Sequence, residues 1–206
     1  MKKLVEKLKK NEFFDKSLER AFLKIRRDDF LPEEVKDLAQ EDKPLPIGSG
    51  QTNSQPSVVA FMLNKLDLKE GQKVLDIGFG SGWTTALLAE LVGKEGRVVA
   101  IERIPELYEF GKKNIDKYDF LTKGRVEIIC GDGFKGLPKK APFDRILVSA
   151  SLKDDIPDSW IEQLGDGSVL LVPIQDSIYK YTKKEGRISR TKFFGFSFVP
   201  LIKDDE

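Results

Sequence analysis

The chain has 206 residues, 40% of them hydrophobic, and its 35 basic and 34 acidic residues leave a formal net charge of +1. This composition is typical of one folded domain, the balanced charge argues against a protein that depends on phosphate contacts, and no apolar run is long enough to cross a bilayer. The sequence has no histidine, which excludes Ser-His-Asp hydrolysis and histidine-based zinc sites. Its one cysteine, Cys130, excludes an intramolecular disulfide. We therefore expect a cytoplasmic protein that uses no metal, nucleic acid or membrane as a partner.

The first 40 residues have a helical pattern. Leu18 and Phe22 lie one helical turn apart, and Asp15 just before them is a suitable N-cap. A second short helix is expected from Pro32, a residue favoured at the first helical position. The segment 44–50 is so rich in proline and glycine that it predicts a structured loop without regular secondary structure.

From residue 73 onward, short apolar runs alternate with amphipathic segments. The expected strands cover 73–77, 97–101, 126–130, 145–149 and 168–172. Helical patterns at 84–92 and 106–114 fall between them, which predicts a mostly parallel sheet covered on both faces. In the tail, 178–181 and 193–199 flank a turn at 184–186 and predict an antiparallel hairpin. We expect a single domain with a helical extension and loop in 1–60, an α/β core in 61–175 and the hairpin in 176–206.

A glycine-rich turn follows the first expected strand. Gly78, Gly80 and Gly82 stand between strand 73–77 and a helix that begins near Trp83. Glycines let the backbone approach a ligand closely, and a helix N-terminus offers unpaired N–H groups. A dinucleotide-binding G-x-G-x-x-G motif would need its third glycine at position 83, where the chain has tryptophan. The loop therefore favours a different nucleotide-type cofactor.

Acidic residues at successive strand ends indicate which cofactor. Asp76, two residues before the first glycine, is awkward beside a pyrophosphate but suits the cationic groups of S-adenosylmethionine. Glu102 closes the second strand, where it can accept hydrogen bonds from both ribose hydroxyls, and Asp132 with Gly133 follows the third strand at the adenine end. Each acid alone is compatible with an ordinary turn or helix start. Together they predict an α/β, Rossmann-like class I methyltransferase with a seven-stranded sheet that binds S-adenosyl-L-methionine.

The sequence resembles the protein-L-isoaspartate (D-aspartate) O-methyltransferase family from about residue 22 to residue 201. The matching segments are 27–32, 44–56, the glycine loop, 101–103, 131–133, 143–146 and 198–201. The glycine loop is shared by many methyltransferases. Segment 44–56 is more specific, because it precedes the Rossmann-like part and is peculiar to this family.

The resemblance implies methyl transfer to the free carboxylate of L-isoaspartyl or D-aspartyl residues in damaged proteins. Nothing in the sequence indicates an obligate assembly, so we expect a monomer. It places the active-site serine on Ser54, whose alternative role is to cap the helix that begins near Pro56. The acceptor carboxylate is already ionised at neutral pH, so orientation and exclusion of water should dominate catalysis. The residues expected at the cofactor are Gln51, Thr52, Asp76, Gly78, Phe79, Gly80, Ser81, Gly82, Trp83, Glu102, Arg103, Asp132 and Gly133. Those expected at the substrate are Ile47, Gly48, Ser54, Ser149 and Ala150.

The chain departs from the family pattern at several positions. Asn53 stands where an aliphatic residue is usual, Phe79 where a small one is usual, and Trp83 in place of tyrosine. Ser57 follows the Ser-x-Pro motif in place of histidine or tyrosine, and Gln175 replaces a glycine. We still expect the chain to bind the methyl donor. The specificity for isoaspartyl peptides is the property that these changes could alter.

Four other functions compete with this interpretation. An RNA or small-molecule methyltransferase of related fold would share the cofactor site, and a donor-binding protein that has lost catalysis would share the whole pattern. A base or amine N-methyltransferase would carry Asn/Asp-Pro-Pro-aromatic after the fourth strand, where 148–152 reads Val-Ser-Ala-Ser-Leu. A cytosine C5 methyltransferase needs a nucleophilic cysteine, whereas Cys130 is expected to be buried in packing.

Overall fold

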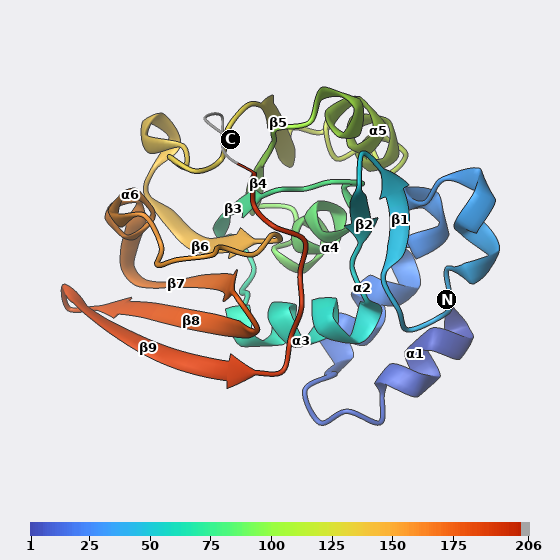
Figure 1. Ribbon diagram of the computed structural model, residues 1–206, viewed down its shortest axis with the longest axis horizontal. Coiled ribbons are helices and arrows are strands. Elements are labelled where there is room, and N and C mark those ends of the chain that lie inside the picture. The colour runs from blue at the N-terminus through green and yellow to red at the C-terminus, as the bar shows by residue number, and fades with distance from the viewer. Residues whose placement is uncertain (203–206) are drawn as a thin grey trace.

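A seven-stranded sheet organises the computed structural model, which describes residues 1–202 (Figure 1). The strand order is β5-β4-β3-β6-β7-β8-β9. The bounds are β3 (Lys73–Ile77), β4 (Arg97–Glu102), β5 (Val126–Cys130), β6 (Phe143–Val148), β7 (Leu164–Ile174), β8 (Ser177–Lys184) and β9 (Arg187–Phe194). The first five strands in this order, from β5 to β7, are all paired in parallel. Strands β8 and β9 extend the sheet through antiparallel pairs. The predicted Rossmann-like, mostly parallel sheet is confirmed.

The register of the parallel strands brings their carboxyl ends together. Ile77 at the end of β3 pairs with Ile101 of β4 on one side and with Val148 of β6 on the other. Glu102 pairs with Cys130 at the end of β5. The segments that follow these strands therefore emerge at one edge of the sheet, which is where ligands bind in open α/β folds.

Helices cover both faces of the sheet. The helices are α1 (Lys2–Leu8), α2 (Lys16–Lys24), α3 (Pro56–Leu66), α4 (Trp83–Leu91), α5 (Pro105–Asp116) and α6 (Asp158–Glu162), with short 3-10 turns η1 (Arg27–Phe30), η2 (Glu33–Leu38) and η3 (Pro138–Lys140). Helices α1 to α5 contribute to the larger buried cluster on one face, and α6 packs against the other face through Trp160. Among residues 1–202, no helix combines the length and apolar character needed to span a membrane.

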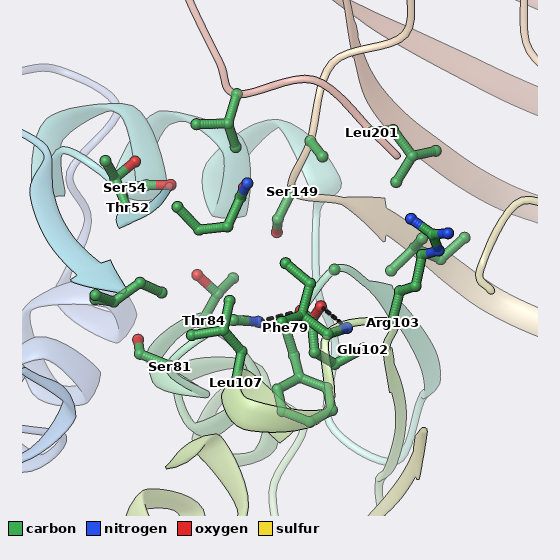
Figure 2. A pocket seen from close by; sticks show the side chains of 18 of the residues that line it. Thr52, Ser54, Phe79, Ser81, Thr84, Glu102, Arg103, Leu107, Ser149 and Leu201 are labelled. Carbon is green, nitrogen blue, oxygen red and sulfur yellow. Dashed lines mark hydrogen bonds between the residues drawn. The ribbon is translucent and has the colours of Figure 1, made fainter. Parts of the chain in front are cut away.

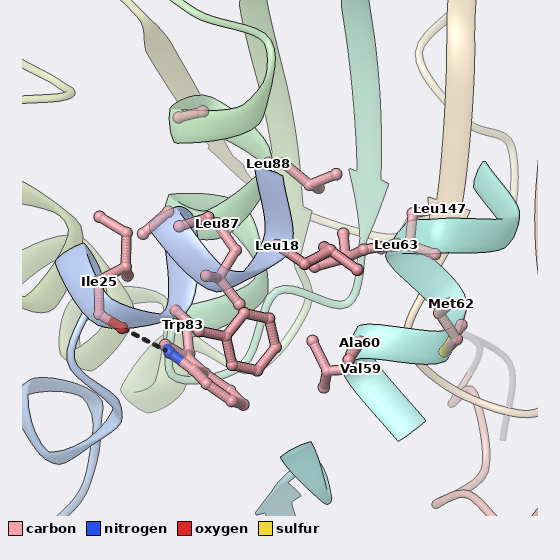
Figure 3. Packing of buried hydrophobic residues seen from close by; sticks show 14 of the residues in the cluster. Leu18, Ile25, Val59, Ala60, Met62, Leu63, Trp83, Leu87, Leu88 and Leu147 are labelled. Carbon is pink, nitrogen blue, oxygen red and sulfur yellow. Dashed lines mark hydrogen bonds between the residues drawn. The ribbon is translucent and has the colours of Figure 1, made fainter. Parts of the chain in front are cut away.

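The N-terminal extension is joined to the sheet domain through the start of α4. The indole of Trp83 is 1% exposed and meets the ring of Phe22 edge-on at a centroid distance of 5.4 Å. Its Nε1 donates a hydrogen bond to the main-chain oxygen of Ile25 (3.4 Å), as Figure 3 shows. Helix α2 is therefore packed directly against the helix that follows the glycine loop.

The expectation of an irregular loop over 44–50 is wrong. Here β1 (Leu45–Gly48) and β2 (Gln51–Asn53) form a two-stranded antiparallel sheet. Leu45 and Ile47 are buried while the residues after each of them are exposed, which is the alternation of a strand. Both turn residues between the strands have positive φ, as a two-residue hairpin turn requires.

The C-terminal hairpin forms, but its second strand lies earlier than 193–199. Only two residues, Glu185 and Gly186, separate the two strands. Strand β9 therefore begins at Arg187, and it ends at Phe194. The chain then crosses the carboxyl edge of the sheet (Figure 1), where a single bridge joins Ser151 and Pro200. The last four residues of the predicted hairpin region, 203–206, lie outside the described residues.

Cys130 is exposed rather than buried. Strand β5 is at the edge of the sheet, and Cys130 is its last residue. An apolar run cannot reveal by itself which strand of a sheet lies at the edge. The expectation of buried packing was therefore wrong for a topological reason.

The cap of α2 supplies a first test. Asp15 Oδ1 accepts hydrogen bonds from the main-chain N–H groups of Ser17 (2.8 Å) and Leu18 (2.9 Å). Asp15→Ala is expected to lower the free energy of unfolding by about 1 kcal/mol in urea titrations, because two helix-end donors lose their acceptor. Asp15→Asn caps equally well and should stay within about 0.5 kcal/mol of the parent. An equal loss in both variants would contradict the cap as the cause.

Candidate active site

One pocket opens at the carboxyl ends of β3, β4 and β6. It holds about 780 Å³ of space, which includes solvent at its open mouth. In Figure 2, Thr52 and Ser54 lie at one end of this pocket, and Glu102 and Arg103 lie at the other. The walls come from the glycine loop, the β1–β2 hairpin, the ends of β4 and β6, and the C-terminal segment.

Most of the residues that the sequence predicted for the site line this pocket. They are Ile47, Gln51, Thr52, Ser54, Gly78, Phe79, Gly80, Ser81, Trp83, Glu102, Arg103, Gly133, Ser149 and Ala150. Four predicted residues do not line it: Gly48, Asp76, Gly82 and Asp132.

Sequence reasoning missed a further group of lining residues. These are Asn53, Ile77, Thr84, Ile101, Ile104, Leu107 and the C-terminal residues Val199, Pro200, Leu201 and Ile202. Ile77 and Ile101 could have been inferred, because they directly precede Gly78 and Glu102, which were predicted for the site. Residues 198–201 of the C-terminal segment match the family pattern, but the sequence did not indicate where in the fold this segment lies. Its position depends on the long-range hydrogen bonds of Ser151 with Val199 and Leu201 (both 2.8 Å).

Two glycines of the loop serve different contacts. Gly80 has φ +53°, and a Cβ there would lie 3.2 Å from Ile47 Cδ1 of the hairpin. Gly82 has φ +85°, and a Cβ there would lie 2.6 Å from Ile115 Cγ1 of α5. Gly80 therefore permits the hairpin to approach the loop, whereas Gly82 permits the loop to pack on α5 and is turned away from the pocket.

The large side chain at position 79 is accommodated by α5. A Cβ on Gly111 of that helix would lie 2.6 Å from Phe79 Cε2, so the phenyl ring rests on the glycine. The Phe79 ring also lies beside Tyr108, with centroids 6.1 Å apart. This departure from the family pattern therefore adds packing behind the glycine loop.

Glu102 holds the glycine loop in place. Its Oε2 accepts a hydrogen bond from the main-chain N–H of Gly80 (2.8 Å), and its Oε1 accepts one from Ile104 (2.9 Å). The side chain is only 6% exposed yet lines the pocket. Because each carboxylate oxygen can accept a second hydrogen bond, Glu102 is held rigidly and still has acceptor capacity for two hydroxyl groups.

Asp76 lies behind the loop rather than in the pocket. Side chains alternate along β3, which directs Asp76 to the α4 side, where its Oδ2 accepts a hydrogen bond from Thr85 Oγ1 (2.7 Å). The residue is 0% exposed. Burial raises the pKa of Asp76 to about 7, the side chains of Thr85 and Ser149 oppose the rise, and the charge of Glu102 adds to it. The predicted direct contact with a cofactor is not the arrangement seen.

Asp132 is a turn residue in this structure. Its Oδ1 accepts a hydrogen bond from the main-chain N–H of Phe134 (2.8 Å), which closes the turn after β5. The turn presents Gly133 to the pocket instead, and a Cβ on Gly133 would lie 2.5 Å from Ile77 Cγ2. The third strand end therefore contributes backbone to the pocket wall rather than a carboxylate.

Ser54 does not cap α3. The N-cap of this helix is Gln55, and no side-chain cap hydrogen bond is present. Within residues 1–202, the hydroxyl of Ser54 makes no hydrogen bond, and Ser54 lines the pocket next to Thr52 (Figure 2). The alternative structural role for Ser54 is thus excluded, and its hydroxyl is available to a ligand.

The raised pKa of Asp76 predicts a pH-dependent stability. The folded protein keeps a proton on Asp76 up to about pH 7, whereas the unfolded chain releases it near pH 4. Stability therefore falls as pH rises between these values, by on the order of 2 kcal/mol from pH 5 to pH 8. Urea unfolding of Asp76→Asn should lack this part of the pH dependence, while the exposed control Asp154→Asn should retain it. Identical slopes in wild type and Asp76→Asn would contradict the shift.

Comparisons with known proteins agree with this geometry. Residues 1–206 match the family model of protein-L-isoaspartate(D-aspartate) O-methyltransferase. The chain is 44% identical over 211 residues to a protein-L-isoaspartate O-methyltransferase of Methanopyrus kandleri, covering 98% of this chain and 91% of the relative. It is 45% identical over 205 residues to one of Thermococcus onnurineus, covering 96% and 91%. A solved structure of a putative protein-L-isoaspartate O-methyltransferase from Plasmodium falciparum, in complex with S-adenosyl-L-homocysteine, superposes with a TM-score of 0.89 at 29% identity and 98% coverage of both chains. The chain belongs to the protein-L-isoaspartate (D-aspartate) O-methyltransferase family.

Proposed function

We propose that this enzyme transfers the methyl group of S-adenosyl-L-methionine to the free carboxylate of L-isoaspartyl or D-aspartyl residues in damaged proteins, and that it works by orientation. The observation that carries the proposal is the pocket itself. It has a rigid carboxylate, Glu102, at one end and the hydroxyls of Thr52 and Ser54 at the other. The chain has no histidine, and this reaction needs no general base, because its nucleophile is already ionised.

The residues at the Glu102 end fit the donor. The two carboxylate oxygens keep acceptor capacity for the ribose hydroxyls. Gly80 lines the pocket and donates its main-chain N–H to this carboxylate, so a ligand there meets the main chain of the loop. S-Adenosyl-L-methionine supplies an electrophilic methyl group when it is bound. We assign Glu102, the glycine loop, Arg103 and Gly133 to the donor.

The hydroxyl end fits the acceptor. Thr52 and Ser54 lie on and just after β2, and Ser149 lines the pocket after β6. Each hydroxyl can donate one hydrogen bond to a carboxylate and so hold it in line with the methyl group. Leu201 lines the pocket beside Arg103, so its apolar side chain adds to the wall at the donor end.

The chemical step is balanced without a proton donor or acceptor. A carboxylate oxygen forms the new bond to the methyl carbon, and the electrons of the broken carbon–sulfur bond stay on sulfur. The methyl ester then collapses spontaneously to a succinimide: the adjacent main-chain nitrogen attacks the ester carbonyl, and methanol leaves with the proton of that nitrogen. Addition of water can reopen the succinimide to normal aspartate. Action as a monomer, in the cytoplasm, on proteins rather than nucleic acids remains a prediction from composition and resemblance.

A peptide assay tests the function directly. The purified protein should transfer labelled methyl from S-adenosyl-L-methionine to a peptide that contains L-isoaspartate, and not to the same peptide with normal aspartate. Transfer to RNA in place of the peptide would favour the rival enzyme. Donor binding in calorimetry without transfer to any acceptor would favour a protein that has lost catalysis.

The role of Glu102 is tested by affinity. Glu102→Ala should weaken binding of S-adenosyl-L-homocysteine by about 1.5 to 3 kcal/mol in calorimetry, because two hydroxyls lose a charged acceptor. Glu127→Ala on the neighbouring strand removes an exposed carboxylate that pairs with Lys140, and it should leave the affinity unchanged. Equal affinity in Glu102→Ala and wild type would remove Glu102 from the site.

A further inference from the structure

Asn53 connects two walls of the pocket that come from distant parts of the chain. It ends β2, between Thr52 and Ser54, and is 4% exposed. Its Oδ1 accepts a hydrogen bond from Arg27 Nε (2.7 Å), and its Nδ2 donates one to Ser81 Oγ (2.9 Å). One buried amide therefore joins the N-terminal extension, the hairpin and the glycine loop.

Arg27 fixes the hairpin from behind. Its guanidinium is fully buried and lies 5.4 Å from the centroid of the Trp83 ring. It donates hydrogen bonds to the main-chain oxygens of Glu41 (2.9 Å) and Lys43 (2.8 Å) before the hairpin, and of Ser54 (3.1 Å) after it. Burial lowers the pKa of Arg27 to about 10, so the group stays charged at neutral pH. Both ends of the hairpin are thus held by one cation.

Ser81 carries the connection into the sheet domain. Its side chain is buried, and its main-chain oxygen accepts a hydrogen bond from Asn114 Nδ2 of α5 (3.1 Å). The hydroxyl of Ser81 faces Asn53. The spacing between hairpin and glycine loop is therefore set by directional hydrogen bonds as well as by the contact of Ile47 with Gly80.

We propose that Asn53 is a positioning residue that fixes the hydroxyl wall of the pocket relative to the glycine loop, so that donor binding on one wall orders the β1–β2 hairpin on the other. The inference rests on the proposed function. A methyl transfer that depends on alignment is sensitive to such spacing, since a displacement of about 1 Å can cost roughly 100-fold in rate. Cutting the network also leaves buried partners unsatisfied, which releases the hairpin from its defined position.

Two variants of Asn53 and one control test its hydrogen bonds. Asn53→Leu has a similar shape but leaves Arg27 Nε and Ser81 Oγ without their partner. Asn53→Asp keeps both links, because a carboxylate accepts hydrogen bonds from the guanidinium and from the serine hydroxyl. The matched control is Asn64→Leu, the same change on α3 outside the pocket.

Two readouts distinguish positioning from a purely structural role. For Asn53→Leu, kcat on an isoaspartyl peptide should fall by about tenfold or more, while the Kd for S-adenosyl-L-homocysteine changes by less than about threefold. Hydrogen exchange of residues 45–53 should slow when S-adenosyl-L-homocysteine binds to wild type, and this protection should be lost in Asn53→Leu. Asn53→Asp should restore kcat to within about threefold and recover the protection. Asn64→Leu should match wild type in both readouts.

Several results would overturn the proposal. Asn53→Leu with unchanged kcat and unchanged ligand-induced protection would remove the residue from any positioning role. An equal loss in Asn53→Leu and Asn53→Asp would show that side-chain identity matters for another reason. If Asn53→Leu does not fold, Ser81→Ala takes its place, because it removes the hydrogen bond between Asn53 Nδ2 and Ser81 Oγ and keeps the bond to Arg27. The proposal then requires that Ser81→Ala lose the ligand-induced protection of residues 45–53. If wild type methylates no isoaspartyl peptide, the proposed function fails, but the exchange measurements still decide the coupling.

Discussion

The carboxylate of Glu102 is the fixed point of the site. It ends β4 beside β3, where the parallel register brings the glycine loop within reach, and it accepts hydrogen bonds from the main-chain N–H groups of Gly80 and Ile104. These bonds hold the glycine loop and the carboxylate in a fixed position relative to each other. An enzyme that works by alignment requires such a fixed arrangement, because a mobile loop would lose the orientation that replaces acid–base help.

The N-terminal extension supplies the other half of the pocket. Arg27 and Asn53 attach the β1–β2 hairpin to the sheet domain through buried hydrogen bonds, and Trp83 packs α2 against the start of α4. The extension is thus built into the same core as the donor-side loop. This construction explains how a segment that precedes the Rossmann-like part in sequence can form a precise wall opposite Glu102.

Much of this architecture could be predicted from sequence, and the exceptions have physical causes. Apolar runs bounded by glycine and acid located β3, β4 and β5 and placed Glu102 at a strand end. Asp76 was assigned to the pocket because strand position was known but side-chain direction was not. The hairpin in 44–53 is shorter than a periodic pattern can reveal, and the edge position of Cys130 depends on strand order. The network of Arg27 and Asn53 spans 26 residues and depends on tertiary packing.

A crystal structure of the complex with S-adenosyl-L-homocysteine would show whether Glu102 holds the cofactor. We expect both ribose hydroxyls to lie within hydrogen-bond distance of the Glu102 carboxylate, with the sulfur directed toward Thr52 and Ser54. The main-chain bonds of Glu102 to Gly80 and Ile104 should persist in that complex. Electron density for the ligand outside this pocket, or a Glu102 side chain turned away from the ribose, would contradict the account.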